Sequence, residues 1–166
     1  DFDAINKMIG QKKIILLEDN CESMGAIYKG KYTGNFGVLG SFSTYFSHHI
    51  STMEGGMVIT DNEELYHIML SLRAHGWTRQ LPDKNKLFIS DNGNTFDASY
   101  KFVLPGYNLR PLELSGAVGV EQLKKLPSII EGRRKNAAFF QEVFADHPVI
   151  FIQKEIEVSS WFGFSL

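Results

Sequence analysis

The sequence predicts an α/β fold in which strands alternate with helices. Residues 13–19 form a short apolar run that ends in two carboxylates, as is typical of a strand covered on both faces in a parallel sheet. Further strand-like runs are followed by apolar residues at helical spacing, Leu65, Ile68, Met69 and Leu72. A second helical pattern begins at Pro111. We therefore expect a mostly parallel sheet with flanking helices.

Local patterns predict the limits of the elements. Glycines and polar alternation in residues 25–34 indicate a small hairpin or a loop, and residues 38–45 and 57–60 are expected to form two further strands. Asp61 is the expected N-cap of a helix that reaches Ala74 and is closed by Gly76. Residues 77–108 have no steady period, which predicts a long ordered loop, and loops of that length are usually functional.

The last third of the chain is expected to be mainly helical. The helix from Pro111 should be interrupted near Pro127 and resume to Phe144, because proline removes a helical N–H. Pro148 should begin a final strand. The chain begins at Asp1 and ends in an aromatic run, which predicts a fragment of a longer protein.

Composition narrows the class of protein. With 166 residues, 43% of them hydrophobic and 22% charged, and a net charge of -2, the chain resembles an average soluble globular domain and not a nucleic-acid binder. The absence of an apolar run near the roughly 20 residues of a membrane helix predicts a cytoplasmic protein without membrane contact. Cys21 is the single cysteine, too few for an internal disulfide or a cysteine-based metal site.

Two segments carry groups suited to chemistry. Glu18, Asp19 and Glu22 follow the first strand, where α/β sheets bind ligands, although acidic residues after a strand are most often helix caps or solvated turn residues. Residues 41–56, "SFSTYFSHHISTMEGG", combine hydroxyls, two adjacent histidines and a di-glycine that permits close backbone approach. The competing interpretation of this segment is a surface turn.

Together with "LRAHGWTR" and "PGYNLRPLELSGAVGVEQLKKL", these segments resemble the DegT/DnrJ/EryC1/StrS sugar aminotransferases. The resemblance implies the aspartate aminotransferase fold, also called fold type I, and a pyridoxal phosphate cofactor. It further implies that residues 1–122 are the C-terminal part of the large cofactor-binding domain and residues 123–166 the start of the small domain. The upstream part of the large domain is then absent.

The same resemblance gives a meaning to the paired histidines. Ordinary members carry Lys-Asn-Ile-Thr-Thr-Gly-Glu-Gly-Gly, whose lysine binds the cofactor covalently. Counting back from Gly56, His48 takes the lysine position and His49 the asparagine position. The chain is thereby similar to a small subgroup of sugar 3-dehydratases, in which histidine replaces the lysine and moves protons to and from the pyridoxamine form of the cofactor.

That subgroup has two branches, which differ in an iron–sulfur cluster. The branch acting on a CDP-linked sugar carries cluster cysteines between the "HG" and "GYN" motifs, and residues 76–107 contain none. The resemblance thus implies the cluster-free branch, which acts on GDP-4-keto-6-deoxy-D-mannose on the route to colitose. No metal is expected.

Cofactor roles are carried over residue by residue. His48 corresponds to the catalytic base, and Asp19 to the aspartate that pairs with the pyridine nitrogen. Glu22 falls beside the ring, and Ser43 at the serine that donates to the phosphate. Asn108 corresponds to an asparagine that reaches the phosphate in the neighbouring subunit, which implies a homodimer with shared active sites.

Substrate binding is expected at His75 and Arg79, with Arg79 holding the carboxylate of L-glutamate, the amino donor. Arg79 is equally well explained as a solvated loop residue. His49 is expected to pack or position its neighbours, and Cys21 to be inert. Two other functions remain open: a non-catalytic or regulatory relative, and a lysine-to-histidine variant of a sugar aminotransferase.

Overall fold

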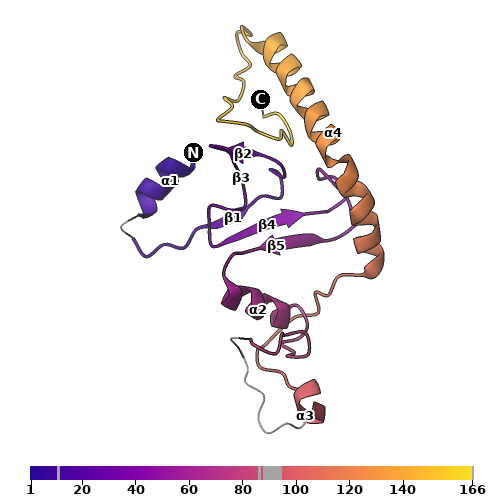
Figure 1. Cartoon of the computed structure of the whole chain (residues 1–166). Coiled ribbons are helices and arrows are strands. Elements are labelled where there is room, and N and C mark those ends of the chain that lie inside the picture. The colour runs from indigo at the N-terminus through magenta and orange to yellow at the C-terminus, as the bar shows by residue number, and fades with distance from the viewer. Residues whose placement is uncertain (11, 86, 88–94, 166) are drawn as a thin grey trace. The chain divides into compact units, whose positions relative to one another are not determined.

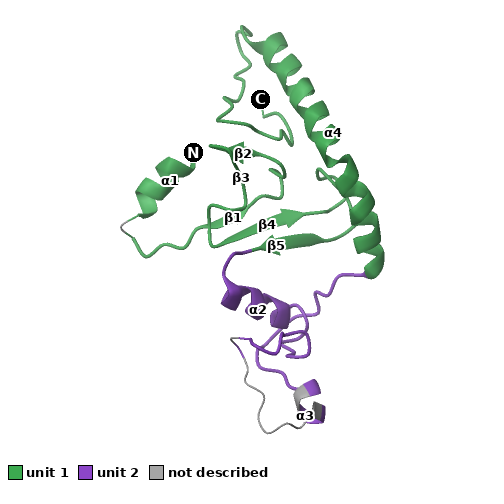
Figure 2. Cartoon of the chain, in the orientation of Figure 1, with its two compact units in different colours: residues 1–59, 113–166 green, residues 60–112 purple. Residues whose placement is uncertain are grey.

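The computed structural model describes residues 1–10, 12–85, 87 and 95–165. They form two compact units, residues 1–59 with 113–166 and residues 60–112 (Figure 2). The first unit contains the sheet, the hairpin, the N-terminal helix and the long helix, and the second contains two shorter helices (Figure 1).

Three strands, β1 (Leu17–Asp19), β4 (Leu39–Ser43) and β5 (Gly56–Ile59), make the sheet of the first unit in the order β1-β4-β5. β1 runs parallel to β4 with Asp19 opposite Ser41, and β5 runs antiparallel to β4 with Gly56 opposite Ser43. The sheet is therefore mixed in its described strands. Its parallel pair brings the carboxyl ends of β1 and β4 to one edge.

The first strand is shorter and more exposed than the sequence predicted. Only residues 17–19 are extended and paired, and within them only Glu18 is buried, while Ile14 and Ile15 are exposed. The prediction of a strand covered on both faces is wrong for this chain. Among the described residues, β1 pairs only with β4 and its other edge stays open.

Buried Glu18 fixes the loop before β4. Its carboxylate accepts the backbone N–H groups of Gly34 at 2.6 Å and of Phe36 and Gly37 at 2.5 Å each. A Cβ at Gly40 would stand 2.5 to 2.9 Å from the backbone of Gly34, so β4 can pass this close to the loop only with glycine there. Glu18 therefore has a structural role.

The predicted hairpin is confirmed. β2 (Ile27–Tyr28) and β3 (Lys31–Tyr32) pair antiparallel. Lys29 and Gly30 both have positive φ, 48° and 77°, which is the geometry of a two-residue hairpin turn. An N-terminal helix that the sequence analysis did not predict, α1 (Phe2–Ile9), is capped by Asp1 and stacks Phe2 on Phe36 with centroids 4.2 Å apart.

The second unit begins with α2 (Glu63–Leu72). Asn62, not Asp61, is its N-cap, because the Asn62 side chain accepts the N–H of Leu65 at 3.1 Å. Gly76 helps to close the helix as expected, with φ of 83° and its N–H on the carbonyl of Ser71 at 2.8 Å.

The predicted loop of residues 77–108 is only partly irregular. It contains α3 (Thr95–Ser99) and returns along residues 101–109, where Trp77 pairs with Phe102 and Ala74 with Asn108. Residues 86 and 88–94 of this loop lie outside the described residues.

A single long helix, α4 (Glu113–Phe144), replaces the two predicted ones. It passes through Pro127 without a break, so the predicted interruption is wrong. Contacts on both sides of the proline hold it: the Gln122 side chain accepts the N–H of Ser51, and Arg134 donates to the carbonyl of Gly25. The predicted domain boundary between residues 122 and 123 falls inside this helix, and the division into large and small domains stays a prediction.

No strand follows α4 in residues 148–165, contrary to the expectation from Pro148. Val158 makes one bridge with Ile27, and the carbonyls of Ser159, Trp161 and Phe162 instead accept hydrogen bonds from arginines of α4. Carbonyls occupied by side chains are not available for a regular ladder.

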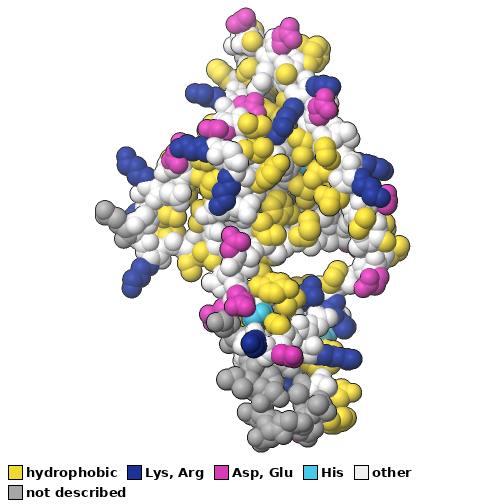
Figure 3. Space-filling view, in the orientation of Figure 1, with side chains coloured by type: hydrophobic (Ala, Val, Ile, Leu, Met, Phe, Trp, Pro, Cys, Tyr) yellow, Lys and Arg dark blue, Asp and Glu magenta, His cyan; other side chains and the backbone are white. Residues whose placement is uncertain are grey.

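The core of the first unit is small, and many apolar side chains stay exposed. Figure 3 shows them gathered on the visible face over the sheet. Exposed residues with large apolar side chains include Leu17, Met57, Val58, Leu114, Val120 and Leu123. Such surfaces usually pack against further protein.

Candidate active site

The carboxyl ends of the parallel strands β1 and β4 place several predicted site residues at one edge of the sheet. Asp19 ends β1 and lies opposite Ser41, while Ser43 ends β4. His48 follows in the loop that joins β4 to β5. Sequence-distant groups thus converge because the two strands are parallel and in this register.

Asp19 presents an exposed carboxylate at this edge. Its Oδ1 accepts the backbone N–H of Cys21 at 3.1 Å and the hydroxyl of Ser41 at 3.3 Å. Hydrogen bonds from Cys21, reinforced by Ser41 and by the charge of His48, hold the pKa of Asp19 below its usual value. The hydrogen bond to Asp19 also raises the pKa of the Cys21 thiol. Asp19 is therefore an anion at neutral pH, and Cys21 stays protonated.

Glu22 is exposed in the turn after β1. It follows Cys21 directly, and its negative charge contributes to raising the pKa of that thiol.

The loop that carries His48 is closed by hydrogen bonds at its base. The N–H of Thr44 donates to Gly55 at 3.0 Å, the N–H of Thr52 donates to Thr44 at 2.8 Å, and the two threonine hydroxyls are 2.7 Å apart. Both threonines are buried. These hydrogen bonds fix the two ends of the loop that carries His48, as precise placement of a reacting group requires.

Met53 in this loop has φ of 73°. It stands where the family pattern has glycine, the residue that adopts this left-handed conformation without steric cost. The chain therefore places a methionine in a left-handed conformation that glycine adopts more easily.

The two histidines have different surroundings. The half-buried His48 has its Nδ1 3.4 Å from the Oγ of Ser43, and its ring centroid lies 5.2 Å from that of Phe162. His49 is 2% exposed, and its Nε2 is 3.2 Å from the carbonyl oxygen of Ser160. Burial lowers the pKa of His49. His48 is thus the accessible imidazole and His49 the packed one, in agreement with the predicted distinction between them.

The predicted substrate residues lie in the second compact unit. His75 is exposed and has φ of 64°, and its N–H donates to the carbonyl of Tyr107 at 2.8 Å. Asn108 is also exposed and pairs with Ala74, so the backbones of the "AHG" and "GYN" motifs lie together. A left-handed non-glycine residue held in this way is often found at functional sites. Arg79 is exposed, with its guanidinium 5.2 Å from the ring centroid of Trp77.

Sequence reasoning gave no role to Phe162 or Arg133, although the structure brings Phe162 to His48. Phe162 lies 114 positions after His48 in the sequence, so no local pattern could have revealed this contact. The described residues also contain no cluster of three or more His, Cys, Asp or Glu side chains suited to a metal ion.

The side chains at this edge of the sheet have the chemical groups that bind pyridoxal phosphate. An ionised carboxylate can pair with a protonated pyridine nitrogen, and a serine hydroxyl can donate to a phosphate oxygen. An imidazole can act as a general acid or base toward the reacting atoms. Asp19, Ser43 and His48 supply these three groups.

No helix in the described part of the chain is both long and apolar enough to span a bilayer.

Comparison with known proteins shows which proteins the chain resembles. The chain is 63% identical over 166 residues to a GDP-4-keto-6-deoxy-D-mannose 3-dehydratase of Yersinia pseudotuberculosis, covering all of this chain and 42% of the relative. It superposes with a TM-score of 0.94 on the Escherichia coli GDP-4-keto-6-deoxy-D-mannose 3-dehydratase with bound hydrated pyridoxal phosphate, at 61% identity, covering 98% of this chain and 42% of that one. A further structure of a GDP-4-keto-6-deoxymannose 3-dehydratase, with a trapped cofactor–glutamate geminal diamine, gives the same values.

The chain therefore spans 42% of the length of these relatives. The superposition confirms the predicted aspartate aminotransferase fold. The model of the DegT/DnrJ/EryC1/StrS aminotransferase family also matches this chain over residues 1–166. On this evidence the chain is a member of the DegT/DnrJ/EryC1/StrS aminotransferase family.

Proposed function

We propose that the whole protein is a pyridoxamine phosphate-dependent 3-dehydratase of GDP-4-keto-6-deoxy-D-mannose, with L-glutamate as the amino donor that regenerates the pyridoxamine form. The observation that carries this proposal is the imidazole of His48, which stands at the family's lysine position beside Ser43 and Asp19. The names of the relatives support the substrate, and the trapped glutamate adduct of one of them supports the donor.

His48 performs the proton transfers in this proposal. When bound, the cofactor supplies the electron sink that makes its methylene carbon acidic. His48 removes a proton from that carbon and delivers one to the hydroxyl that leaves from sugar C3, so that the hydroxyl departs as water. A single imidazole serves as base and then acid because its neutral ring nitrogen accepts a proton that the same nitrogen can then donate.

Ser43 determines which nitrogen of His48 acts. The Oγ of Ser43 already accepts the N–H of Tyr45 at 3.2 Å, and its own proton is the one available for the cofactor phosphate. Since a hydroxyl has one donor and two acceptor positions, the Nδ1 of His48 then donates to the remaining lone pair of Ser43. The Nε2 of His48 is left as the free base.

Replacement of lysine by histidine explains the choice of reaction. A lysine amine at position 48 would capture the aldehyde form of the cofactor and compete with the free amine that must react with the sugar ketone. Imidazole forms no such stable bond but keeps the proton-transfer capacity. The site then favours loss of the hydroxyl over transfer of the amine.

The remaining residues hold the reactants. Asp19, an exposed anion, pairs with the pyridinium nitrogen, and Glu22 lies beside the ring. Arg79 binds the carboxylate of L-glutamate, and His75 contacts the substrate from the left-handed turn next to it.

The proposal is tested with the whole protein, pyridoxal phosphate and L-glutamate. Absorbance should change from the aldehyde to the amine form of the cofactor, and subsequent addition of GDP-4-keto-6-deoxy-D-mannose should give the 3-deoxy ketosugar. The CDP-linked 4-keto-6-deoxy sugar serves as the matched control and should react at least about tenfold more slowly. A protein that binds cofactor without either conversion would be the non-catalytic relative, and an aminated sugar would indicate an aminotransferase.

A second prediction concerns the homodimer. We expect Asn108→Ala in the whole protein to weaken cofactor binding by about tenfold, because one hydrogen bond to a charged phosphate contributes roughly 1.5 kcal/mol or more. The dissociation constant is measured by titration with pyridoxal phosphate, and sedimentation gives the assembly state. Asn35→Ala is a suitable control, since Asn35 is exposed in the loop before β4 and its side chain donates to the nearby carbonyl of Tyr32. Full cofactor affinity and activity in a monomer would contradict a shared site.

A further inference from the structure

The imidazole of His48 meets aromatic rings as well as Ser43. The ring of Phe162 lies 5.2 Å away with an interplanar angle of 39°, and that of Tyr45 lies 6.1 Å away at 65°. Rotation of an imidazole about its last side-chain bond has broad, shallow preferences. The two neighbouring rings, together with Ser43, therefore set the orientation of the His48 imidazole.

Phe162 belongs to the 159–162 segment, which α4 holds by its backbone. The Nη1 of Arg133 donates to the carbonyls of Trp161 at 3.1 Å and of Phe162 at 2.8 Å, and its guanidinium lies 5.6 Å from the Phe162 ring centroid. Arg134 donates to the carbonyl of Ser159 at 2.9 Å. Two consecutive arginines thus hold three of the four carbonyls of the segment.

His49 holds the fourth carbonyl. Its Nε2 is 3.2 Å from the oxygen of Ser160, and because a carbonyl only accepts, this nitrogen carries the hydrogen. The His49 side chain is buried, as is Ser160, and its ring lies 6.1 Å from that of Phe162. Burial and the positive charge of Arg133 favour its neutral form. The neighbour of the catalytic imidazole therefore anchors the segment that contacts it.

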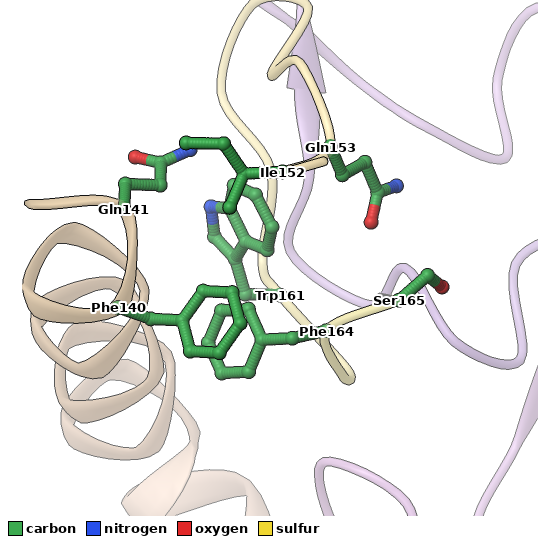
Figure 4. A pocket seen from close by; sticks show the side chains of 7 residues that line it. All are labelled: Phe140, Gln141, Ile152, Gln153, Trp161, Phe164 and Ser165. Carbon is green, nitrogen blue, oxygen red and sulfur yellow. The ribbon is translucent and has the colours of Figure 1, made fainter. Parts of the chain in front are cut away.

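Trp161 fixes the segment from its other side. Figure 4 shows its indole beside Phe140 and Phe164 in a shallow hollow next to α4. The rings of Phe140 and Phe164 stack at 4.4 Å, and the indole nitrogen donates to Glu155 at 3.1 Å. The carbonyl of Trp161 is held by Arg133 and its indole by Glu155, and neither contact involves Phe164.

We infer that Phe162 is a positioning residue for His48: held by Arg133, Arg134 and His49, its ring fixes the imidazole so that Nδ1 faces Ser43 and Nε2 faces the reactants. This inference rests on the proposed role of His48 as the base. It also explains why the site has two adjacent histidines: His48 moves protons, and His49 holds the 159–162 segment that contacts His48.

The test uses Phe162→Ala and Phe162→Tyr in the whole protein, with Phe164→Ala as the matched control. Phe164 is two positions away and packs on Phe140 and Trp161, so its loss removes a similar ring without touching His48 in the described contacts. We expect Phe162→Ala to lower kcat for the glutamate half-reaction about ten- to hundredfold with little change in KM, because small misplacements of a reacting group have effects of this size. Phe162→Tyr should retain most of the rate, and Phe164→Ala should stay within about threefold.

A second measurement is independent of turnover. Nitrogen-15 spectra of the cofactor-free protein with labelled histidine report the tautomer of the His48 ring, whose signals are identified by their absence in His48→Asn. Phe162→Ala should shift these signals toward a mixture of tautomers, and Phe164→Ala should not. If Phe162→Ala does not fold, Phe162→Leu fills the space without a flat ring and should show the same shift.

Unchanged His48 signals and an unchanged kcat in Phe162→Ala or Phe162→Leu would overturn the inference, as would an equal loss in Phe164→Ala. Failure of the proposed function is distinguishable, because in that case the unaltered protein would itself lack the glutamate half-reaction while the ring signals could still respond to Phe162.

Discussion

Replacing His48 by asparagine in the whole protein will slow both half-reactions by at least about a hundredfold, while pyridoxal phosphate still binds. Each half-reaction requires proton transfer at the same cofactor carbon, and a general acid–base group typically contributes 10²–10⁴-fold. Asparagine is close to the imidazole in size and keeps an amide group near the Oγ of Ser43, but it cannot carry protons. Single-turnover absorbance with L-glutamate and product analysis with the GDP-linked sugar measure the two rates.

His49→Asn is the matched control for this experiment. It removes the Nε2 contact with the Ser160 carbonyl and should lower thermal stability, since a buried carbonyl left without its partner costs about 1–3 kcal/mol. Its effect on the proton transfers should be smaller than that of His48→Asn, because Arg133 and Arg134 still hold the segment that carries Phe162. Loss of turnover in His49→Asn with turnover retained in His48→Asn would show that the base is His49 and that the assigned register is one position off.

The residues of the strand edge were predictable because each belongs to a local pattern. A run of apolar residues that ends in carboxylates placed Asp19 at the end of β1, and the spacing to the di-glycine placed His48 in the following loop. Parallel pairing of neighbouring strands then brings such groups together without further information. The hairpin was equally local, because Lys29 and Gly30 decide the turn.

Elements that depend on distant contacts were not predictable in the same way. Pro127 predicted a helix break, yet α4 continues through this residue. The helix is held on both sides of it, at Gln122 by Ser51 and at Arg134 by Gly25. The aromatic run at the end of the chain has strand propensity, but arginine side chains occupy its carbonyls. Strand propensities differ by only about 1 kcal/mol per residue, so tertiary hydrogen bonds of this kind outweigh them.

Glu18 and Asp19 show why a motif cannot assign roles to its own members. Both are carboxylates at the end of β1, yet Glu18 is buried on three backbone N–H groups and Asp19 is exposed at the edge. Alternation of side chains along a strand sends neighbouring residues to opposite faces. Only the burial pattern separates the structural carboxylate from the one available to a cofactor.

Asp19→Asn should therefore abolish much of the chemistry without disturbing the fold. The amide oxygen can still accept the N–H of Cys21, so the turn after β1 is retained, and no buried contact is lost. The negative charge is lost, however, and with it the partner that keeps the pyridine nitrogen protonated. We expect the glutamate half-reaction to fall by at least about a hundredfold, the scale on which one electrostatic partner contributes to a transition state.

Its pH dependence and control sharpen this last test. Because the pKa of Asp19 lies below its usual value, the carboxylate is ionised throughout pH 6–9, and the slowing in Asp19→Asn should be nearly constant across that range. Asp3→Asn is the matched control: Asp3 is an exposed carboxylate on α1 whose pKa is also lowered, through its hydrogen bond with Lys29, and its replacement should leave the rate unchanged. Cofactor affinity is measured by titration and the rate by the change from aldehyde to amine absorbance. An Asp19→Asn protein within a few-fold of the normal rate would show that Asp19 is a turn residue, as hydrogen bonding to Cys21 alone would permit, and that another group pairs with the pyridine nitrogen.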